Sequence, residues 1–533
     1  MRIRRPLAIG AAILAVLVLV ALLLAPDEVG RLSPAAFVRL PIDLIIGLGL
    51  ILVLPPKARR VGVLVIGVVL GVLAILKILS LGFSTVLDRP FDPVADWSFL
   101  GSGATYLRLS SGRGVEVAAI VGVILLSLLV LGLAVVAFRS IAKVSVDHRT
   151  PAGVVLGVLA VGWVILAITG AQLVTAVPVA ARDGYDRVRQ VTAGIEDQRQ
   201  FAAALKQDQF ADVPADRLLT GLRGKDVVFA IIESYGRTAL DRPEIAPQID
   251  QVLADGTARL ARAGYAARSG FLTSPVVGGG SWLADSTLLS GLWVDNQQRY
   301  DTLTRSDRLT LTSAYAKSGG RAVAVMPATV ADFPEAGFFG YDQVYASKDL
   351  DYQGPLYAFA MMPDQYTLSQ FQQRERAQTG RPPVMAVIPL ISSHAPWEPV
   401  PTLRSWDQVG DGSTFESKPG SGDSADLVIH RDPARLRADY RTAISYSLQT
   451  VISYVETYGD DNLVLVFLGD HQPAPAVTGP GAGRDVPITI VARDRTLLDR
   501  TTSWGWTDGL RPAANAPVWP MDQFRDRFLT AFS

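Results

Sequence analysis

Four side chains with the chemistry of metal ligands follow predicted strands or begin a predicted helix. The run DVVFAII leads directly into Glu233, and the run NLVLVFL leads through a glycine into Asp470 and His471. Three glycines precede Ser281, which is predicted to occupy the N-cap position of an amphipathic helix. The three oxygens and one imidazole nitrogen of this set suit a tetrahedral Zn²⁺ or Mn²⁺ ion. Coordination would lower the pKa of the Ser281 hydroxyl and make it a nucleophile at neutral pH.

A further histidine, His394, follows a third apolar run, VMAVIPLI, and two serines. It would be free to protonate a leaving oxygen or to hold a phosphate group. Each piece has a simpler interpretation when it is taken alone. Glu233 could be a loop carboxylate, Ser281 could only cap its helix, and His394 could bond within its own loop. The chain has four histidines, and two of them follow strands beside the other candidates, so the combination favours a catalytic site.

The elements that must position these residues are typical of an α/β fold. Strands are predicted at 226–232, 321–326, 384–390, 462–468 and 486–491, and a long helix at 433–458. The near-continuous apolar runs indicate central strands that are covered on both faces. Ligands collect beyond the carboxyl ends of such strands. If the strands that carry the candidates are parallel neighbours, those candidates meet at one edge of a central, mostly parallel sheet.

The first third of the chain has the composition of a membrane protein. Of the 533 residues, 49% are hydrophobic, only 19% are charged, and the mean hydropathy is +0.28, whereas about a quarter of the residues of an average soluble protein are charged. Five apolar runs are long enough to span a bilayer: Pro6 to Ala25, Ala36 to Pro55, Val61 to Phe83, Val117 to Phe138 and Ala152 to Val177. Basic clusters lie before the first run, between the second and third, and between the fourth and fifth. These loops are therefore predicted in the cytoplasm, and everything after Val177 outside.

We accordingly predict three regions in the chain. Residues 1–180 form a membrane domain of five transmembrane helices, residues 181–224 a helical juxtamembrane linker, and residues 225–533 the extracytoplasmic catalytic domain. A net charge of +0 argues against nucleic acid as the main partner. The chain has no cysteine, so any metal must be held by oxygen and imidazole ligands.

The order of these motifs resembles the alkaline phosphatase and sulfatase superfamily. The shared features are a strand ending in Glu233-Ser234, a glycine-led serine at a helix start, the run SSHAPW at 392–397, and a strand ending in Gly469-Asp470-His471. Within the superfamily, five N-terminal spans before an extracytoplasmic domain are similar to lipoteichoic acid synthases and, more loosely, to phosphoethanolamine transferases. The resemblance implies a sulfatase-like α/β catalytic domain.

The resemblance also implies a role for each matching residue. Ser281 would be the covalent nucleophile, at the place where lipoteichoic acid synthases use threonine. His394 would match a substrate-binding histidine, and Asp364, which lies where relatives carry an acidic residue, joins it in the predicted substrate-binding set. The ligands of one divalent metal ion, Mn²⁺ or Zn²⁺, would be Glu233, Ser281, Asp470 and His471.

Departures from the superfamily pattern narrow these expectations. Ser281 is followed by Trp-Leu-Ala-Asp in place of the x-Pro-x-Arg of sulfatases, which argues against cleavage of sulfate esters. A second metal would need further His and Asp ligands, and the outer domain has only His430 to spare, which we expect at the surface. The aromatic residues Trp282, Tyr341 and Trp397 could pack on a glycerol or a sugar, or they could belong to the core. Trp282 is the one we include among the substrate-binding candidates.

The activity that the resemblance implies is a metal-dependent phosphotransferase of the cytoplasmic membrane. It would move a phospho-headgroup, glycerol phosphate or phosphoethanolamine, from a membrane phospholipid to Ser281 and then to a glycan or lipid acceptor of the cell envelope. Two alternatives stay open. One is a membrane-bound phosphatase or phosphodiesterase that uses the same serine and metal with water as acceptor. The other is a non-enzymatic membrane protein, against which the complete set of four ligand positions argues.

Overall fold

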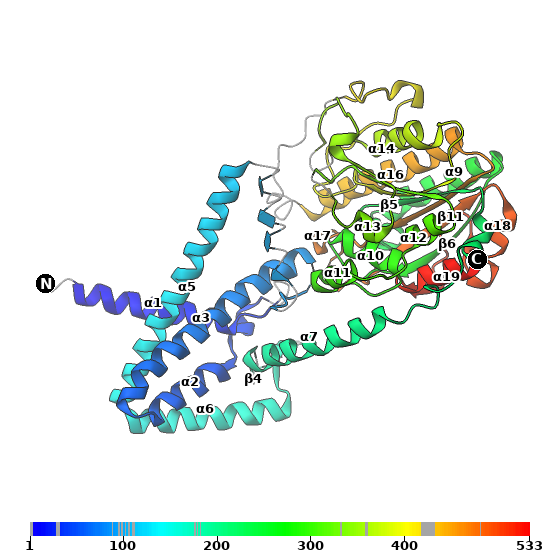
Figure 1. Cartoon of the computed structure of the whole chain (residues 1–533). Helices are drawn as coiled ribbons and strands as arrows, with labels where there is room; N and C mark the ends of the chain where they lie inside the picture. The colour runs from blue at the N-terminus through cyan, green and yellow to red at the C-terminus, as the bar shows by residue number, and fades with distance from the viewer. Residues whose placement is uncertain are drawn as a thin grey trace. The chain divides into compact units, whose positions relative to one another are not determined.

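The computed structural model describes the chain except for residues 1–3, 28–31, 88, 94–95, 98–99, 102, 105–106, 109–111, 175–176, 179, 182, 331–332, 358–360, 417–431 and 480. His430, predicted at the surface, lies outside the described residues. Contacts between residues divide the chain into two compact units, unit 1 (Met1–Arg199) and unit 2 (Gln200–Ser533), both drawn in Figure 1. Each unit is considered by itself.

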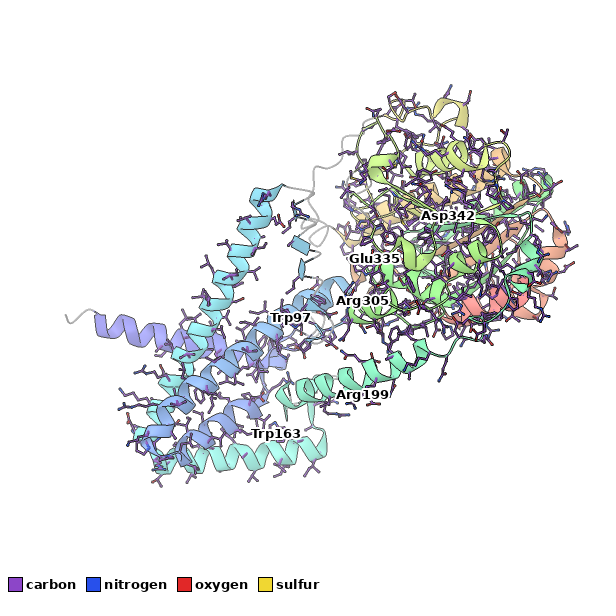
Figure 2. All side chains as sticks on the ribbon, viewed as in Figure 1. Trp97, Trp163, Arg199, Arg305, Glu335 and Asp342 are labelled. Atoms are coloured by element: carbon purple, nitrogen blue, oxygen red, sulfur yellow. The ribbon has the colours of Figure 1, made fainter. Side chains whose placement is uncertain are left out.

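Unit 1 consists mainly of apolar helices. They are α1 (Arg4–Leu24), α2 (Ile42–Val53), α3 (Pro56–Leu87), α5 (Arg113–Asp147) and α6 (Arg149–Thr169), followed by α7 (Asp183–Leu205), which continues into unit 2. The short elements are η2 (Pro34–Phe37), β1 (Leu40–Pro41), β2 (Gln172–Val174), β3 (Val177–Pro178) and β4 (Ala180–Ala181). Large aliphatic side chains stand exposed along α5 and α6 (Figure 2), as expected of helices that face lipid.

Three helices among the described residues are long and apolar enough to cross a membrane, not the five that the sequence predicts. They are Pro56–Thr85, Arg113–Asp147 and Arg149–Thr169. Two described apolar stretches are shorter: Ala12–Leu24, which is the part of α1 whose side chains are described, and Ile42–Val53.

The second predicted span is wrong because Pro41 interrupts it. Pro41 has extended backbone (φ −76°, ψ 103°) and directly precedes the 12-residue helix α2. Proline donates no backbone hydrogen bond and pushes the residue before it out of the helical region. Twelve helical residues cover about 18 Å, which is short of the roughly 30 Å hydrocarbon core of a bilayer.

Unit 2 is built on a nine-stranded, mostly parallel sheet. The strand order is β12-β6-β11-β10-β5-β9-β7-β8, with β13 paired to β6. The strands are β5 (Asp226–Ile232), β6 (Ala266–Thr273), β7 (Arg321–Met326), β8 (Gln343–Ala346), β9 (Val384–Leu390), β10 (Leu463–Gly469), β11 (Asp485–Ala492), β12 (Thr507–Asp508) and β13 (Val518–Pro520). The five strands from β10 to β8 run parallel, and β11 is antiparallel to both of its neighbours. The predicted α/β fold with a mostly parallel central sheet is therefore confirmed.

Helices cover both faces of this sheet (Figure 1). The longer ones are α9 (Ala246–Arg262), α10 (Ser281–Ser290), α14 (Asp364–Phe371), α16 (Pro433–Tyr458) and α19 (Gln523–Phe532). The shorter ones are α8 (Thr238–Asp241), α11 (Gln297–Leu303), α12 (Leu311–Lys317), α13 (Ala336–Phe339), α17 (Pro475–Thr478) and α18 (Arg495–Asp499). Along β5, Val228 belongs to a core cluster with residues of α9 and α16, whereas the ring of Phe229 packs against Phe524 and Phe528 of α19. The central strand is thus buried from both sides, which explains its unbroken apolar sequence.

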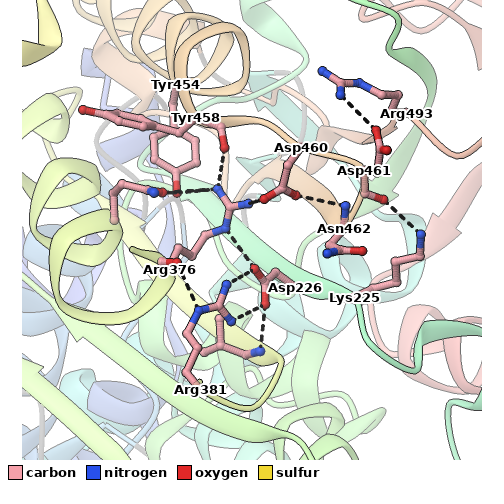
Figure 3. Close-up of polar contacts among 12 residues, drawn as sticks. Lys225, Asp226, Arg376, Arg381, Tyr454, Tyr458, Asp460, Asp461, Asn462 and Arg493 are labelled. Atoms are coloured by element: carbon pink, nitrogen blue, oxygen red, sulfur yellow. Dashed lines mark hydrogen bonds and ion pairs between the residues drawn. The ribbon is translucent and has the colours of Figure 1, made fainter. Parts of the chain in front are cut away.

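A buried ion-pair network holds the start of β5 (Figure 3). The carboxylate of Asp226 accepts hydrogen bonds from the guanidinium groups of Arg376 (3.1 Å) and Arg381 (2.8 and 2.5 Å). It also accepts the N–H of Val384, the first residue of β9, at 3.0 Å. Arg376 donates in addition to Asp460, just before β10, at 2.9 Å. The network therefore joins the beginnings of β5, β9 and β10, at the opposite end of these strands from the candidate site.

Replacing Asp226 by Asn should destabilise unit 2 by about 3 kcal/mol, because breaking a buried ion pair leaves a buried charge without compensation. Burial would raise the pKa of Asp226, but the bonds from Arg381 and Val384 outweigh it and lower the pKa below its ordinary value of 3.8. A carboxylate whose pKa is lowered on folding stabilises the protein above its unfolded pKa. The difference between native protein and variant should therefore be full at neutral pH and disappear as the pH falls below about 4.

Urea denaturation of the segment 200–533, followed by tryptophan fluorescence at several pH values, would measure this effect. The control is Asp461→Asn, which removes the exposed partner of Arg493 and should change stability by less than about 1 kcal/mol. Equal effects of the two substitutions at pH 7 would refute the structural role of the Asp226 network.

Candidate active site

The candidate residues meet because three neighbouring parallel strands end in register. Ile232, the last residue of β5, pairs with Gly469 of β10 on one side and with Leu390 of β9 on the other. The next residues along the chain are Glu233 and Asp470, and His394 follows four residues after Leu390. The sheet thus delivers all three strand-end motifs to one edge, where ligands of open α/β sheets bind.

Two local features shape this edge. A side chain at Gly469 would overlap the backbone carbonyl of Tyr235, so only glycine lets the two strand ends come so close. Ser234 has a positive φ of 59°, an uncommon conformation for a residue other than glycine. In this conformation its N–H donates to Asp470 Oδ1 (2.8 Å) and its hydroxyl to Glu233 Oε1 (2.8 Å). The strained residue therefore orients both carboxylates.

Ser281 begins α10 after a run of glycines with positive φ. Gly280, at φ 84°, occupies the N-cap position, and Ser281 is the first helical residue. The prediction that Ser281 itself falls at the N-cap is wrong by one residue, because the left-handed conformation at that position favours glycine. As a result, the Ser281 hydroxyl does not cap its own helix. It points instead to Glu233 and His471.

The four predicted metal ligands form one cluster. Ser281 Oγ lies 3.0 Å from Glu233 Oε2 and 3.4 Å from His471 Nε2. His471 Nε2 lies 3.4 Å from Glu233 Oε1 and 3.5 Å from Asp470 Oδ2. Ligand atoms about 2.0–2.2 Å from a tetrahedral ion lie about 3.3–3.6 Å from one another. Most of the observed separations fall in this range, so the donor atoms fit a divalent ion of that size with little movement.

The charge and protonation of the cluster agree with this fit. Glu233, Asp470 and His471 are all buried. Burial, followed by the negative charge of Glu233, raises the pKa of Asp470 to about 7. His471 Nδ1 lies 2.8 Å from the carbonyl oxygen of Gln472. Since a carbonyl can only accept, Nδ1 donates to it, and Nε2 is the nitrogen that faces the carboxylates and would bind a metal ion.

A cavity of about 290 Å³ opens beside Ser281. Glu233, His394 and Trp282 line it together with apolar and aromatic side chains. No lysine or arginine is found among the described residues of its lining. A phosphate group in this cavity would therefore meet carboxylates and no cationic side chain other than histidine, unless a metal ion is bound.

His394 is held at the rim of the cavity by its own loop. Its Nδ1 lies 2.7 Å from the carbonyl oxygen of Ala395 and must donate, so any proton exchange with a ligand would use Nε2. Ser393 fixes the same loop to the end of β5 by donating to the Glu233 carbonyl at 2.6 Å.

Asp364 does not line the cavity, contrary to its prediction as a substrate-binding residue. It is fully buried, and its carboxylate accepts the Ser392 N–H (2.8 Å) and the Ser447 hydroxyl (2.6 Å). Burial raises its pKa to about 6. The geometry assigns Asp364 a positioning role, because it ties the loop that carries His394 to α16.

The aromatic candidates separate into two groups. Trp282 and Tyr341 line the cavity, whereas Trp397 is 2% exposed and packs edge to face on Tyr440. Trp397 therefore belongs to the core, which was one of its two predicted roles.

Sequence reasoning missed Asp285 and Tyr300, which also line the cavity. Burial, followed by the charges of Asp470 and Glu233, raises the pKa of Asp285 well above its ordinary value. The sequence contains a signal for Asp285, because it is four residues after Ser281 and a helix places such residues on one face. For Tyr300 the sequence offers no comparable signal.

Replacing Ser234 by Ala should weaken binding of Mn²⁺ or Zn²⁺ about tenfold, because groups that orient metal ligands contribute 10- to 100-fold to affinity. Alanine keeps the backbone N–H that holds Asp470 and removes only the hydroxyl bond to Glu233. Calorimetric titration of the metal-free protein would measure the change. Ser318→Ala, just before the start of β7 at the other end of the sheet, is the control and should bind as the native protein does. An unchanged affinity in Ser234→Ala would contradict the assigned ligand set.

Comparison with known proteins finds similar solved structures but no similar sequence. No protein-family model matches the chain, and no curated protein is similar to it in sequence. Similar solved structures include the lipoteichoic acid synthase LtaP from Listeria monocytogenes (15% identity, 52% of this chain and 67% of that chain covered, TM-score 0.34). A protein of the alkaline phosphatase superfamily from Vibrio parahaemolyticus is similar at 15% identity, with 56% and 69% covered and a TM-score of 0.34. The phosphoglycerol transferase GacH from Streptococcus pyogenes is similar at 15% identity, with 63% and 92% covered and a TM-score of 0.37. These similarities agree with the resemblance that the motifs predict. Because the TM-scores are below 0.5, the role of each residue rests on the geometry of the site.

Proposed function

We propose that the chain is a metal-dependent phosphotransferase that moves a phospho-headgroup from a membrane phospholipid to an acceptor of the cell envelope through a covalent phospho-serine. One observation carries the proposal. The hydroxyl of Ser281 lies 3.0 to 3.4 Å from Glu233 and His471, in a buried cluster of metal-ligand type that opens on a cavity. Such a serine has no evident structural task, since it does not cap its helix.

The metal ion supplies two things when it is bound: it lowers the pKa of the Ser281 hydroxyl and offsets negative charge on the phosphoryl oxygens. Its ligands would be Glu233, Ser281, Asp470 and His471, and their mutual distances suit Mn²⁺ or Zn²⁺. Two buried carboxylates of like charge so close together are otherwise costly, which supports a resident cation.

The residues of the chain perform a two-step transfer. Ser281 Oγ, which has already lost its proton and is an alkoxide, forms a bond to phosphorus while the bond from phosphorus to the diacylglycerol oxygen breaks. The imidazolium of His394 gives its Nε2 proton to that oxygen. An acceptor hydroxyl then forms a bond to phosphorus, its proton passes to His394 Nε2, and the bond to Ser281 Oγ breaks. Asp364 positions the loop of His394 throughout.

The cavity beside Ser281 suits the headgroup. Asp285, one turn along α10 from Ser281, places a carboxylate among the aromatic residues Trp282, Tyr300 and Tyr341. We infer that Asp285 binds the polar end of the headgroup, which is a hydroxyl in glycerol phosphate or an ammonium in phosphoethanolamine. The aromatic side chains enclose the carbon atoms between this end and the phosphate.

The orientation of unit 1 suits an extracytoplasmic reaction. Basic residues flank the start of α3, the end of α5 and the start of α6. By the positive-inside rule these three ends are cytoplasmic, and the C-terminal end of α6 is outside. We therefore infer a multi-pass protein of the cytoplasmic membrane with residues 225–533 as its extracytoplasmic catalytic domain. Residues 181–224 link this domain to the membrane, and tethering gives it a high effective concentration of lipid headgroups.

The test is intact mass spectrometry of the full-length protein after incubation with Mn²⁺ and mixed bacterial phospholipids. The native protein should gain one phospho-headgroup, Ser281→Ala should gain none, and the mass should identify the headgroup. Ser286→Ala is the matched control, because this serine lines the same cavity on the same helix and should leave the adduct in place. Free headgroup or phosphate that accumulates in a Ser281-dependent way without an acceptor product would favour a hydrolase. The absence of both adduct and turnover would refute an enzymatic role.

Replacing Asp285 by Asn should raise the KM for the phospholipid donor about tenfold or more, since a hydrogen bond to a charged group contributes about 1.5–3 kcal/mol. Binding of Mn²⁺ should persist, because Asp285 is outside the proposed ligand set. Asp255→Asn, an exposed change on α9, should leave both quantities unchanged. Steady-state kinetics and a metal titration would separate the two effects, and a loss of metal binding with an unchanged KM would show that Asp285 does not contact the headgroup.

A further inference from the structure

A second cavity, of about 600 Å³, lies in unit 1 between the C-terminal end of α2, the first turns of α3 and the last turns of α5. Its polar lining contains four basic side chains and a single carboxylate: Arg59, Arg60, Arg139, Lys143 and Asp147. The rest of its wall is apolar, with Val63, Leu64 and Val135 among the residues. The cavity is therefore amphipathic and has an excess of positive charge.

The helices that form the cavity are held together close by. A side chain on Gly67 or Gly71 of α3 would press on Val135 or Leu131 of α5, so the two glycines, four residues apart, bring the helices into close contact. The cavity opens beside this contact, toward the basic ends of both helices. The cavity is therefore bounded by two helices, α3 and α5, that pack closely against each other.

The four cations have no acidic partner among the described residues. Arg59 donates only to the Leu54 carbonyl, at 2.9 Å, and its Nε is buried without a hydrogen-bond partner. No ion pair within the described part of the chain joins Arg60, Arg139 or Lys143 to a carboxylate. Cations that are grouped in this way repel one another unless an anion lies between them. The charge of the cavity thus calls for an anionic occupant.

The apolar wall identifies the class of that occupant. A small soluble anion would gain nothing from Val63, Leu64 and Val135, and a zwitterionic lipid would bring a cation of its own into the basic rim. A guanidinium group binds phosphate oxygens in a fixed, paired geometry. Basic pockets between transmembrane helices are known to bind anionic lipid headgroups. We propose that this cavity binds an anionic phospholipid, with its phosphate among Arg59, Arg60, Arg139 and Lys143 and an acyl chain along the apolar wall.

This lipid site is distinct from the proposed catalytic centre. It is built from residues of unit 1 alone, contains no metal-ligand cluster among its described residues, and lies at helix ends that the positive-inside rule places in the cytoplasm. A lipid bound there is held and not consumed. The proposal of a lipid site therefore does not depend on the activity proposed for Ser281.

The test compares two double variants of the full-length protein that lose the same charge. Arg60→Gln with Lys143→Gln removes one exposed basic group of the cavity from each of α3 and α5. Lys57→Gln with Arg113→Gln removes one exposed basic group outside the cavity from each of the same helices. The delipidated protein in detergent is titrated with phosphatidylglycerol or with phosphatidylcholine, and bound lipid is counted by native mass spectrometry. Phosphatidylglycerol should bind the native protein and the control variant equally, and the cavity variant about tenfold more weakly.

Three results would overturn the proposal. Equal losses in both double variants would mean attraction by net charge only, and equal binding of phosphatidylcholine would mean that the headgroup charge is not recognised. Displacement of the lipid by an equal concentration of sn-glycerol 3-phosphate would mean that a soluble phosphate is the occupant. Unfolding of the cavity variant is recognised separately, because its thermal midpoint and its Mn²⁺ binding should match those of the control.

Discussion

The parallel pairing of β5 with both of its neighbours is the constraint on which the catalytic geometry depends. At its start, Asp226 binds the first N–H of β9 and, through Arg376, is linked to Asp460, three residues before β10. Seven residues later the same strand delivers Glu233, one step beyond the pairs that Ile232 makes with Gly469 and Leu390. A shift of one residue in this register would turn the side chains to the other face of the sheet. The buried ion pairs at one end thus help to define the positions of the proposed metal ligands at the other end.

A second consequence of this arrangement is a concentration of negative charge that the protein alone does not offset. Burial, followed by the negative charge of the neighbouring carboxylates, raises the pKa of both Asp470 and Asp285. The described lining of the cavity offers no lysine or arginine. In the network around Asp226 the negative charge is compensated, since two guanidinium groups pair with one buried carboxylate. The first arrangement suits a site that must accept a cation, and the second suits a site that only has to hold strands together.

The sequence predicts the strands of the site well and its details less well. Unbroken apolar runs locate β5, β7 and β9 to the residue, because a short run of this kind that is bounded by turn residues is typical of a strand covered on both faces. The polar residues after such strands are then candidates by position alone. Ser281 is misplaced by one residue because the conformation of Gly280 is a property of the loop and not of the sequence pattern.

Other features depend on tertiary contacts that no local pattern contains. The motif around Asp364 does not reveal that Ser392 and Ser447 surround its carboxylate, since these residues come from distant parts of the chain. Pro41 in the sequence already indicates that the run from Ala36 to Pro55 is not one helix. The prediction of a single span followed the apolar composition of the run instead. Glycine is common in membrane helices, so the sequence of α3 alone does not show that Gly67 lies in close contact with α5.

The two cavities differ in how they could offset the negative charge of a phosphate group. The cavity beside Ser281 surrounds the proposed nucleophile with carboxylates and a histidine, so the proposed metal ion would offset the charge of an entering phosphate and also activate the serine. The cavity of unit 1 surrounds an apolar wall with guanidinium and ammonium groups, so a phosphate can bind there directly. It offers no nucleophile among its described lining residues, and nothing there would weaken a phosphoester bond. The proposed cleavage of a phospholipid and the proposed retention of a phospholipid thus require opposite distributions of charge, and the two cavities differ in this way.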